Sequence, residues 1–271
     1  MTDIEFNRAA TGRTMIMGIL NCTPDSFSDG GKFFDKDSAV AHALKMAEEG
    51  ADIVDIGGES TRPGYTPVEE DEEIRRVVPV IKELSSHGLI MSVDTTKIKV
   101  AEASFEAGCQ IINDIGGDLK GSGMADCAAS LGAYLVIMFN CRINGECDGS
   151  VANRAKTEID ENIEYALSRG VAESRIIVDP GIGFGTTRPQ DIELTKMVRD
   201  LAEGPYPVLY AASRKRIVKD LSSFAEDPDL KDDASDALAL YSATAGASIV
   251  RSHRIAPLKA QLEIIDRLIG G

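Results

Sequence analysis

The sequence has no apolar run that approaches the length of a membrane span, so no segment predicts a transmembrane helix. Its first residues lack a basic region followed by an apolar stretch, and we therefore expect no secretion signal. There is also no linker, low-complexity run or break in composition, which predicts a single domain over residues 1–271. With 43% hydrophobic residues, the chain can bury one large core or two small ones.

Cysteine is scarce and does not occur in a C-x-x-C pair. The five cysteines form an odd set, which favours reduced thiols in a cytoplasmic protein. Cys141 and Cys147 are close enough in sequence to suggest a metal site. No histidine lies near them, however, so two free thiols in a loop are the favoured interpretation.

Basic residues are outnumbered, with 29 Lys and Arg against 44 Asp and Glu, and the net charge is −15. A field of this sign repels nucleic acid and anionic membranes, so we expect neither as a partner. If the substrate is an anion, the site must gather its own Arg and Lys.

What the sequence does contain is a regular alternation of short apolar runs and amphipathic segments. The runs are rich in Ile, Val and Leu on both faces, as in parallel strands that are covered on both sides. They lie at residues 14–20, 51–56, 89–93, 110–113, 134–138, 175–178, 208–211 and 248–250. Helices are predicted over 38–49, 68–84, 97–107, 124–131, 158–169, 189–201, 236–245 and 257–269. Eight such pairs predict a (β/α)8 TIM barrel, and an open doubly wound sheet is the alternative.

Segment 139–155 is the longest stretch without clear periodicity. It contains Asn140, Asn144, Gly145 and Gly149, which favour a mobile loop after the fifth strand.

Polar residues follow seven of the eight predicted strands, at the end where the active sites of TIM barrels lie. Any one of them could be a strand-end cap, but seven matched groups are hard to assign to caps alone. Strand five is the exception, because it ends in Met138 and Phe139. The polar groups are Asn21, the run from Glu59 to Arg62, Asp94, Asn113 with Asp114, Asp179, Ser213 to Lys215, and Arg251 with His253.

The chemistry of these groups divides in two. Asp94, Asn113 and Asp179 can grip the hydrogen-bonding edge of a flat heterocycle with an aminopyrimidine face, and the two carboxylates favour developing positive charge on it. Lys215, Arg251 and His253 suit a phosphate or pyrophosphate leaving group. Their neighbour Asn21 could bind the same anion or Mg²⁺, which prefers oxygen ligands. Neither a zinc constellation nor a Ser-His-Asp set is evident, which disfavours hydrolysis through a covalent serine.

A series of motifs, in this order, resembles the dihydropteroate synthase family. They are NCTPDSFSDGG at 21–31, GESTRPG at 58–64, SVDT at 92–95, INDI at 112–115, DPGIGFG at 179–185, SRK at 213–215 and VRSH at 250–253. The resemblance implies a barrel that forms a homodimer. It also implies a transferase that joins 4-aminobenzoate to 6-hydroxymethyl-7,8-dihydropterin pyrophosphate with Mg²⁺, through a pterin-methylene cation.

The resemblance also implies roles for individual positions. Asp94, Asn113, Asp179 and Lys215 match pterin-binding residues, with Asp94, Asp179 and Lys215 as the catalytic set and Met138 as an apolar wall. The pyrophosphate and Mg²⁺ site is matched by Asn21, Arg251 and His253, with Asn21 the metal ligand, and Ser213 lies in the substrate-binding SRK motif. Thr61, Arg62, Pro63, Phe27 and Phe184 match the parts that close over aminobenzoate.

Several positions depart from the family pattern. Phe139 replaces a histidine after strand five, which predicts the loss of a polar partner near the pterin or pyrophosphate. Ala211 replaces a glycine, where its methyl group could crowd the pterin floor. Thr186 replaces a lysine, and Arg254 an aspartate. A divergent pterin-binding paralogue, either a folate-dependent methyltransferase or a non-catalytic binder, therefore remains the alternative.

Overall fold

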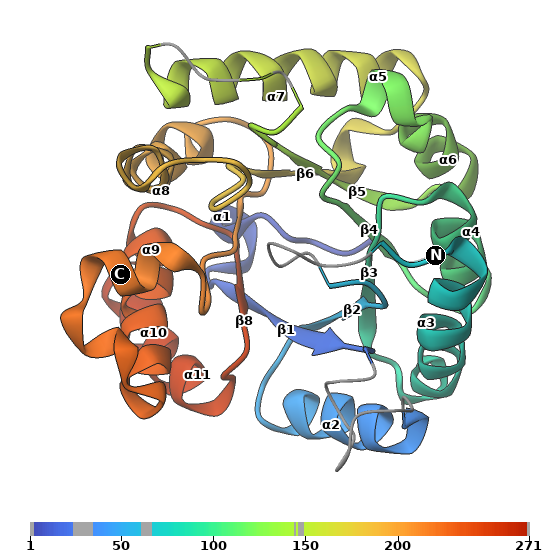
Figure 1. Ribbon diagram of the computed structural model, residues 1–271, viewed down its shortest axis with the longest axis horizontal. Coiled ribbons are helices and arrows are strands. Elements are labelled where there is room, and N and C mark those ends of the chain that lie inside the picture. Colours follow the sequence, from blue (N-terminus) through green and yellow to red (C-terminus); the bar gives the residue numbers. More distant parts are fainter. Residues whose placement is uncertain (1–2, 24–34, 61–66, 144, 146–148, 270–271) are drawn as a thin grey trace.

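The computed structural model contains eight parallel strands, surrounded by helices (Figure 1). It describes residues 3–23, 35–60, 67–143, 145 and 149–269. The strands are β1 Met15–Asn21, β2 Ile53–Gly57, β3 Ile90–Asp94, β4 Ile111–Asp114, β5 Tyr134–Met138, β6 Ile176–Asp179, β7 Leu209–Tyr210 and β8 Ile249–Ser252.

The strands close into a barrel. Hydrogen bonding follows the order β6-β5-β4-β3-β2-β1-β8-β7. The two ends of this sheet meet at a parallel bridge between Val178 and Val208, where the Val178 amide donates to the Pro207 carbonyl at 2.9 Å. The predicted (β/α)8 TIM barrel is confirmed, and the open-sheet alternative is wrong.

The helices begin and end at residues suited to helix termini. Asp35 and Ser150 cap two of them through side-chain oxygens, and α3 carries four acidic residues in its first turn, which complements the helix dipole. The α-helices are α1 Arg8–Thr11, α2 Lys36–Glu48, α3 Glu70–Leu84, α4 Ile98–Glu106, α5 Leu119–Ser122, α6 Met124–Leu131, α7 Val151–Ser168, α8 Arg188–Ala202, α9 Arg216–Leu221, α10 Pro228–Thr244 and α11 Ala256–Ile269. Short 3₁₀ turns are η1 Ser85–His87, η2 Glu173–Arg175 and η3 Ser223–Glu226.

Two helices, α7 and α10, begin several residues earlier than predicted. α7 starts at Val151 rather than 158, because Val151, Ala155, Ile159 and Ile163 continue one buried stripe at four-residue spacing. The expected loop over 139–155 is therefore wrong in its second part. α10 starts at Pro228 rather than 236, eight residues before the predicted helix.

Side chains fill the interior of the barrel, so the barrel encloses no pore. Side chains alternate along each strand, and those that point inward make a separate apolar cluster. This inner plug consists of Met15, Met17, Ile53, Ile111, Tyr134, Val136, Ile177, Leu209 and Ile249, together with Phe6 from the N-terminal segment. Two larger clusters lie between the strands and the surrounding helices. No helix in the described part of the chain is long and apolar enough to cross a membrane.

Candidate active site

A polar layer lies directly above the apolar plug, at the carboxyl ends of the strands. Along β2 the inward position after Ile53 is Asp55, and along β8 the inward position after Ile249 is Arg251. The same alternation turns Asp94 of β3, Asn113 of β4 and Asp179 of β6 toward the barrel axis. Five strands therefore direct polar side chains into one space.

The guanidinium of Arg251 is held between two carboxylates of neighbouring strands. Its Nε donates to Asp55 Oδ2 at 2.6 Å, and its Nη2 donates to Asp94 Oδ2 at 2.8 Å. The same Asp55 oxygen accepts from Asn113 Nδ2 at 3.1 Å. These four residues form one continuous hydrogen-bonded network across β8, β2, β3 and β4.

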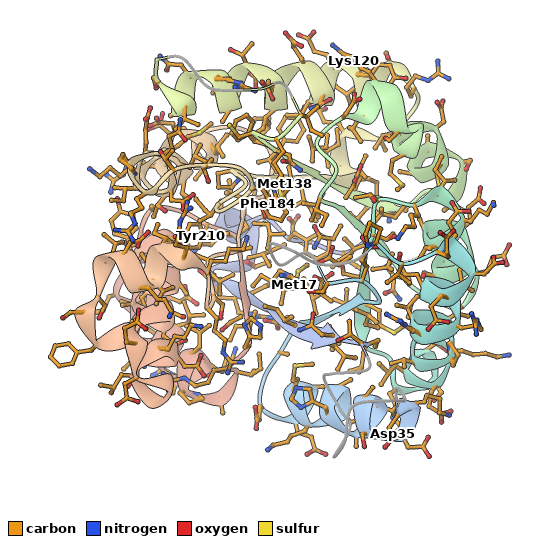
Figure 2. The ribbon with its side chains drawn as sticks, in the orientation of Figure 1. Met17, Asp35, Lys120, Met138, Phe184 and Tyr210 are labelled. Carbon is orange, nitrogen blue, oxygen red and sulfur yellow. The ribbon has the colours of Figure 1, made fainter. Side chains whose placement is uncertain are left out.

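Lys215 follows β7, the strand that pairs with β8. Its ammonium donates to the Ile182 carbonyl at 2.8 Å and lies 4.6 Å from the centre of the Phe184 ring. Met138 ends β5 beside Asp179 in register, and Figure 2 labels Met138 and Phe184 in the central part of the molecule. An aromatic ring, a thioether and a cation thus border the carboxylates.

Burial governs the charges of this site. It raises the pKa of both Asp94 and Asp179, although Arg251 opposes the shift at Asp94 and Lys215 opposes it at Asp179. Burial lowers the pKa of Lys215 to about 8, despite the attraction of Asp179. At Arg251 burial opposes the charged form, but Asp55 and Asp94 outweigh it and keep the pKa above its ordinary value. Such perturbed groups are typical of functional sites.

A second polar pair follows β7 and β8. Ser213 Oγ lies 3.0 Å from His253 Nδ1, and the His253 amide donates to the same hydroxyl at 3.3 Å. This contact joins the SRK and VRSH segments in space. Asn21 ends β1, the strand that pairs with β8 on one side and β2 on the other.

The comparisons with known proteins agree with this geometry. Residues 17–253 match the family model described as "Pterin binding enzyme". A dihydropteroate synthase of Clostridium beijerinckii is 48% identical over 207 residues, which is 76% of each chain. The crystal structure of Xanthomonas albilineans dihydropteroate synthase with 4-aminobenzoic acid has 39% identity and a TM-score of 0.88, covering 94% of this chain and 93% of that one. The Clostridium difficile enzyme in the presence of pteroic acid has 38% identity and a TM-score of 0.89, covering 96% and 98%.

The chain belongs to the dihydropteroate synthase family. The transferase class expected from the sequence follows from this membership.

The structure places most of the residues that matched the family's motifs around one space. Asp94, Asn113 and Arg251 are directly hydrogen-bonded to a common network, and Lys215 contacts Phe184. Ser213 and His253, which are 40 positions apart, form a separate pair after β7 and β8. Phe27, Thr61, Arg62 and Pro63 lie outside the described residues.

The flanks of the second family loop are fixed by a group of charges. Glu59 Oε2 accepts from the amide of Val68 at 2.6 Å and from Lys97 Nζ at 2.8 Å. Lys97 also pairs with Glu73, which is 1% exposed, and Arg76 donates to the Gly58 carbonyl at 2.9 Å. The described first part of the GESTRPG motif, residues 58–60, is therefore anchored to α3, to Lys97 and to the amide of Val68.

Sequence reasoning missed Asp55, the residue at the centre of the network. Its signal was a carboxylate in the middle of the otherwise apolar run 53–56. A charged group in a strand that is buried on both faces needs a partner. Here the partners are Arg251 and Asn113, which are remote in sequence.

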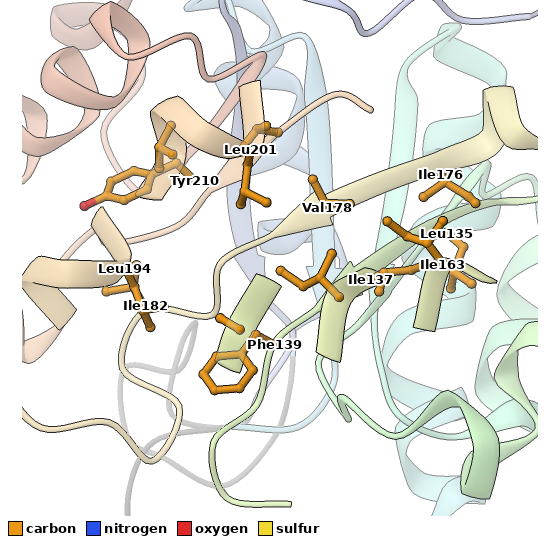
Figure 3. Packing of buried hydrophobic residues seen from close by; sticks show 14 of the residues in the cluster. Leu135, Ile137, Phe139, Ile163, Ile176, Val178, Ile182, Leu194, Leu201 and Tyr210 are labelled. Carbon is orange, nitrogen blue, oxygen red and sulfur yellow. The ribbon is translucent and has the colours of Figure 1, made fainter. Parts of the chain in front are cut away.

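The prediction that Phe139 leaves a polar gap in the site is wrong. Its side chain is 1% exposed and belongs to the outer apolar cluster, together with Ile137 and Ile182 (Figure 3). Its ring also lies 5.7 Å from the Arg154 guanidinium of α7. Because β5 turns Met138 inward, the next side chain points outward toward the helix layer.

Two other departures have local partners. The Thr186 hydroxyl donates to Asp191, a fully buried carboxylate at the start of α8. Arg254 forms ion pairs with Asp233 and Asp236 of α10. Ala211 is buried after β7, and its effect on a ligand remains a prediction.

Proposed function

We propose that this chain condenses 6-hydroxymethyl-7,8-dihydropterin pyrophosphate with 4-aminobenzoate to give 7,8-dihydropteroate and pyrophosphate. The observation that carries the proposal is the ring formed by Asp94, Asn113, Asp179 and Lys215 above the apolar plug. Donors and acceptors there face a space bordered by Met138 and Phe184. A flat, polar-edged heterocycle matches that combination of apolar walls and directional groups.

The carboxylates serve the developing cation in this scheme. The bond between the pterin methylene and the pyrophosphate oxygen breaks, and its electron pair leaves with pyrophosphate. Asp94 and Asp179 then stabilise the positive charge on the pterin-methylene group, because they are fixed acceptors in a site with little water. The 4-aminobenzoate nitrogen forms the new bond to the methylene carbon and loses a proton. We assign contact with the aminobenzoate to Phe184, and to Phe27, Thr61, Arg62 and Pro63 on their match to the family motifs alone.

The cations serve the leaving group. Arg251 is positioned by two carboxylates, and among the described residues none accepts a hydrogen bond from its Nη1, which can meet an anionic oxygen. Ser213 and His253 supply further hydrogen bonds at the ends of β7 and β8. These groups offset the net charge of −15 at the place where an anion accumulates.

Mg²⁺ fits this site as an ion held mainly by the substrate. Among the described residues no three His, Cys, Asp or Glu side chains form a metal-binding group. Asn21 at the end of β1 offers one neutral amide oxygen, and Mg²⁺ commonly combines one or two protein oxygens with substrate phosphates. When bound, the ion would neutralise the charge of the departing pyrophosphate.

The proposed assembly is a homodimer in the cytoplasm. Large apolar side chains are exposed on α9, η3, α10 and α11, where α10 packs against both α9 and α11. They include Leu221, Phe224, Leu230, Tyr241, Ile264 and Leu268. A second copy covering this surface would remove them from water. Sedimentation of wild-type protein and Phe224→Glu tests it, since only a dimer interface predicts dissociation of the variant. Among the described residues, Cys22, Cys109 and Cys127 are free thiols, as in a reducing compartment.

The activity is tested by pyrophosphate release from dihydropterin pyrophosphate and Mg²⁺, with and without 4-aminobenzoate. Release coupled to the appearance of 7,8-dihydropteroate is the expected result. Tight pterin binding without turnover would contradict the proposal and favour the non-catalytic paralogue. Methyl transfer from a reduced folate would favour the methyltransferase alternative.

A further inference from the structure

We infer that Asp55 is a positioning residue that sets the orientation of both Arg251 and Asn113. This inference rests on the proposed function, because it assigns Asp55 a role in that same site. Asp55 lies on β2, directly above the inner plug, and is 0% exposed. It received no role from the sequence motifs, yet it connects residues of β4 and β8.

One carboxylate oxygen of Asp55 accepts both hydrogen bonds. Oδ2 accepts from Arg251 Nε at 2.6 Å and from Asn113 Nδ2 at 3.1 Å. A carboxylate can accept several hydrogen bonds but, when ionised, donates none. The side chain therefore imposes a direction on each neighbour, because both must turn a donor toward it.

The contact determines which way the Asn113 amide faces. Its NH₂ group donates to Asp55, so its carbonyl oxygen points away from Asp55. Reversing the amide would bring two acceptor oxygens together. Asp55 thus gives Asn113 a fixed order of donor and acceptor toward a ligand, which an amide without this neighbour would not have.

The same contact determines the plane of the Arg251 guanidinium. Asp55 holds Nε and Asp94 holds Nη2, so two sides of one planar group are bound to two adjacent strands. A single carboxylate would leave the group free to rotate about its one contact. The second contact fixes it as a rigid fork, which is the geometry that recognition of an anion requires.

A comparison with Asp52 separates this role from ordinary support of the barrel. Asp52 stands three residues earlier, and it binds the Ile16 amide at 2.9 Å and the Arg13 side chain. That carboxylate joins β1 to the segment before β2 at the opposite end of the barrel. Asp55 binds no backbone group in the described chain, and its Oδ1 has no hydrogen-bond partner there.

The experiment is a double-mutant cycle on the whole enzyme, measured by steady-state kinetics with dihydropterin pyrophosphate. Asp55→Asn removes the charge but keeps the shape, and we expect kcat/KM to fall by about 100-fold. Arg251→Met should cost at least as much. If Asp55 acts through Arg251 and Asn113, the double variant should lose less than the product of the two single losses, because the contact with Arg251 is already absent and only the contact with Asn113 remains to be lost.

The controls keep the two proposals distinct. Activity of the wild-type protein tests the proposed function, independently of any variant. Asp52→Asn should lower the midpoint of thermal unfolding while kcat/KM stays at the wild-type value. Wild-type kinetics in Asp55→Asn, or losses that multiply fully in the double variant, would overturn the positioning role.

A second variant answers the question if Asp55→Asn does not fold. Arg251→Lys keeps the positive charge but cannot reach two carboxylates as a planar fork. We expect a loss in kcat/KM of at least about tenfold in the folded variant. Full activity would show that the orientation of the guanidinium is unimportant, and the inference would fail.

Discussion

Gly181 lies against the backbone of Phe139 so closely that a Cβ atom at position 181 would be 1.8 Å from the Phe139 carbonyl oxygen. Gly181 also has a φ of +77°, and its amide donates to Asp179 Oδ1 at 2.7 Å. Three residues farther along the loop, the Phe184 carbonyl accepts from the Cys141 amide at 3.1 Å. The glycine-rich loop after β6 thus packs directly against the segment that follows β5.

This relationship predicts that Gly181→Ala is severely destabilising. The substitution combines a left-handed backbone with a clash against main-chain atoms, so we expect a loss in unfolding free energy of about 3 kcal/mol or more. Chemical denaturation measures the loss. Gly132→Ala is the matched control, because Gly132 has a φ of +65° and a Cβ atom added there would meet no atom within 4 Å. It should cost about 1 kcal/mol, and equal losses in the two variants would contradict the steric argument.

The buried carboxylate of Asp191 binds the second half of the same loop, and its removal should weaken the attachment of the loop. Asp191 accepts from the Gly183 amide at 2.9 Å and from Arg216 at 3.1 Å. Asp191→Ala leaves these two donors and the Thr186 hydroxyl without this acceptor, with an expected cost of about 2–4 kcal/mol in unfolding free energy. Because the loop carries Phe184, KM for the substrates should rise as well.

Asp200 provides the control for that variant. It lies on the same helix, α8, and is exposed. Asp200→Ala should change stability by no more than about 0.5 kcal/mol and leave KM unaltered. If denaturation curves of the Asp191 and Asp200 variants coincide, the proposed fastening of the loop is refuted.

The sequence predicted the barrel better than it predicted the network inside it. Parallel strands that are covered on both faces are continuous apolar runs, and such runs are visible in sequence. The contact between Asp55 and Arg251 spans 196 positions and depends on the closure and register of the barrel. Likewise, the outward direction of Phe139 follows from the pleat of β5, because Met138 points inward. Neither fact is contained in a local pattern.

The position of Phe139 predicts the effect of restoring the family's histidine there. Phe139→His places a polar ring in an apolar cluster, and we expect a loss of about 2 kcal/mol in unfolding free energy. KM for dihydropterin pyrophosphate should not change, because the side chain points away from the site. Leu167→His on α7 serves as the control, since Leu167 is 38% exposed and lies outside the proposed dimer surface, so its replacement should cost much less. A stable Phe139→His variant with a lowered KM would return this residue to the site.

The lowered pKa of Lys215 predicts how the activity of the enzyme changes at alkaline pH. Burial lowers its pKa to about 8, so the ammonium is present below that pH and is lost above it. If its charge binds substrate, kcat/KM should fall as the pH rises through about 8. A pH–rate profile measures this, and Lys215→Arg is the comparison, because a guanidinium stays charged throughout the range. The descending limb should be absent from whatever activity the arginine variant retains.

Stability should change with pH in the opposite direction from activity. The pKa of Lys215 is about 8 in the folded chain and near the ordinary lysine value of 10.5 when unfolded. Between these values the unfolded chain binds more protons, so the contribution of Lys215 to stability increases with rising pH. Wild-type protein should therefore gain stability relative to Lys215→Met from pH 7 to pH 10, measured by denaturation at each pH. Parallel curves for the two proteins would mean that Lys215 titrates alike in both states, and the alkaline loss of activity would then need another group.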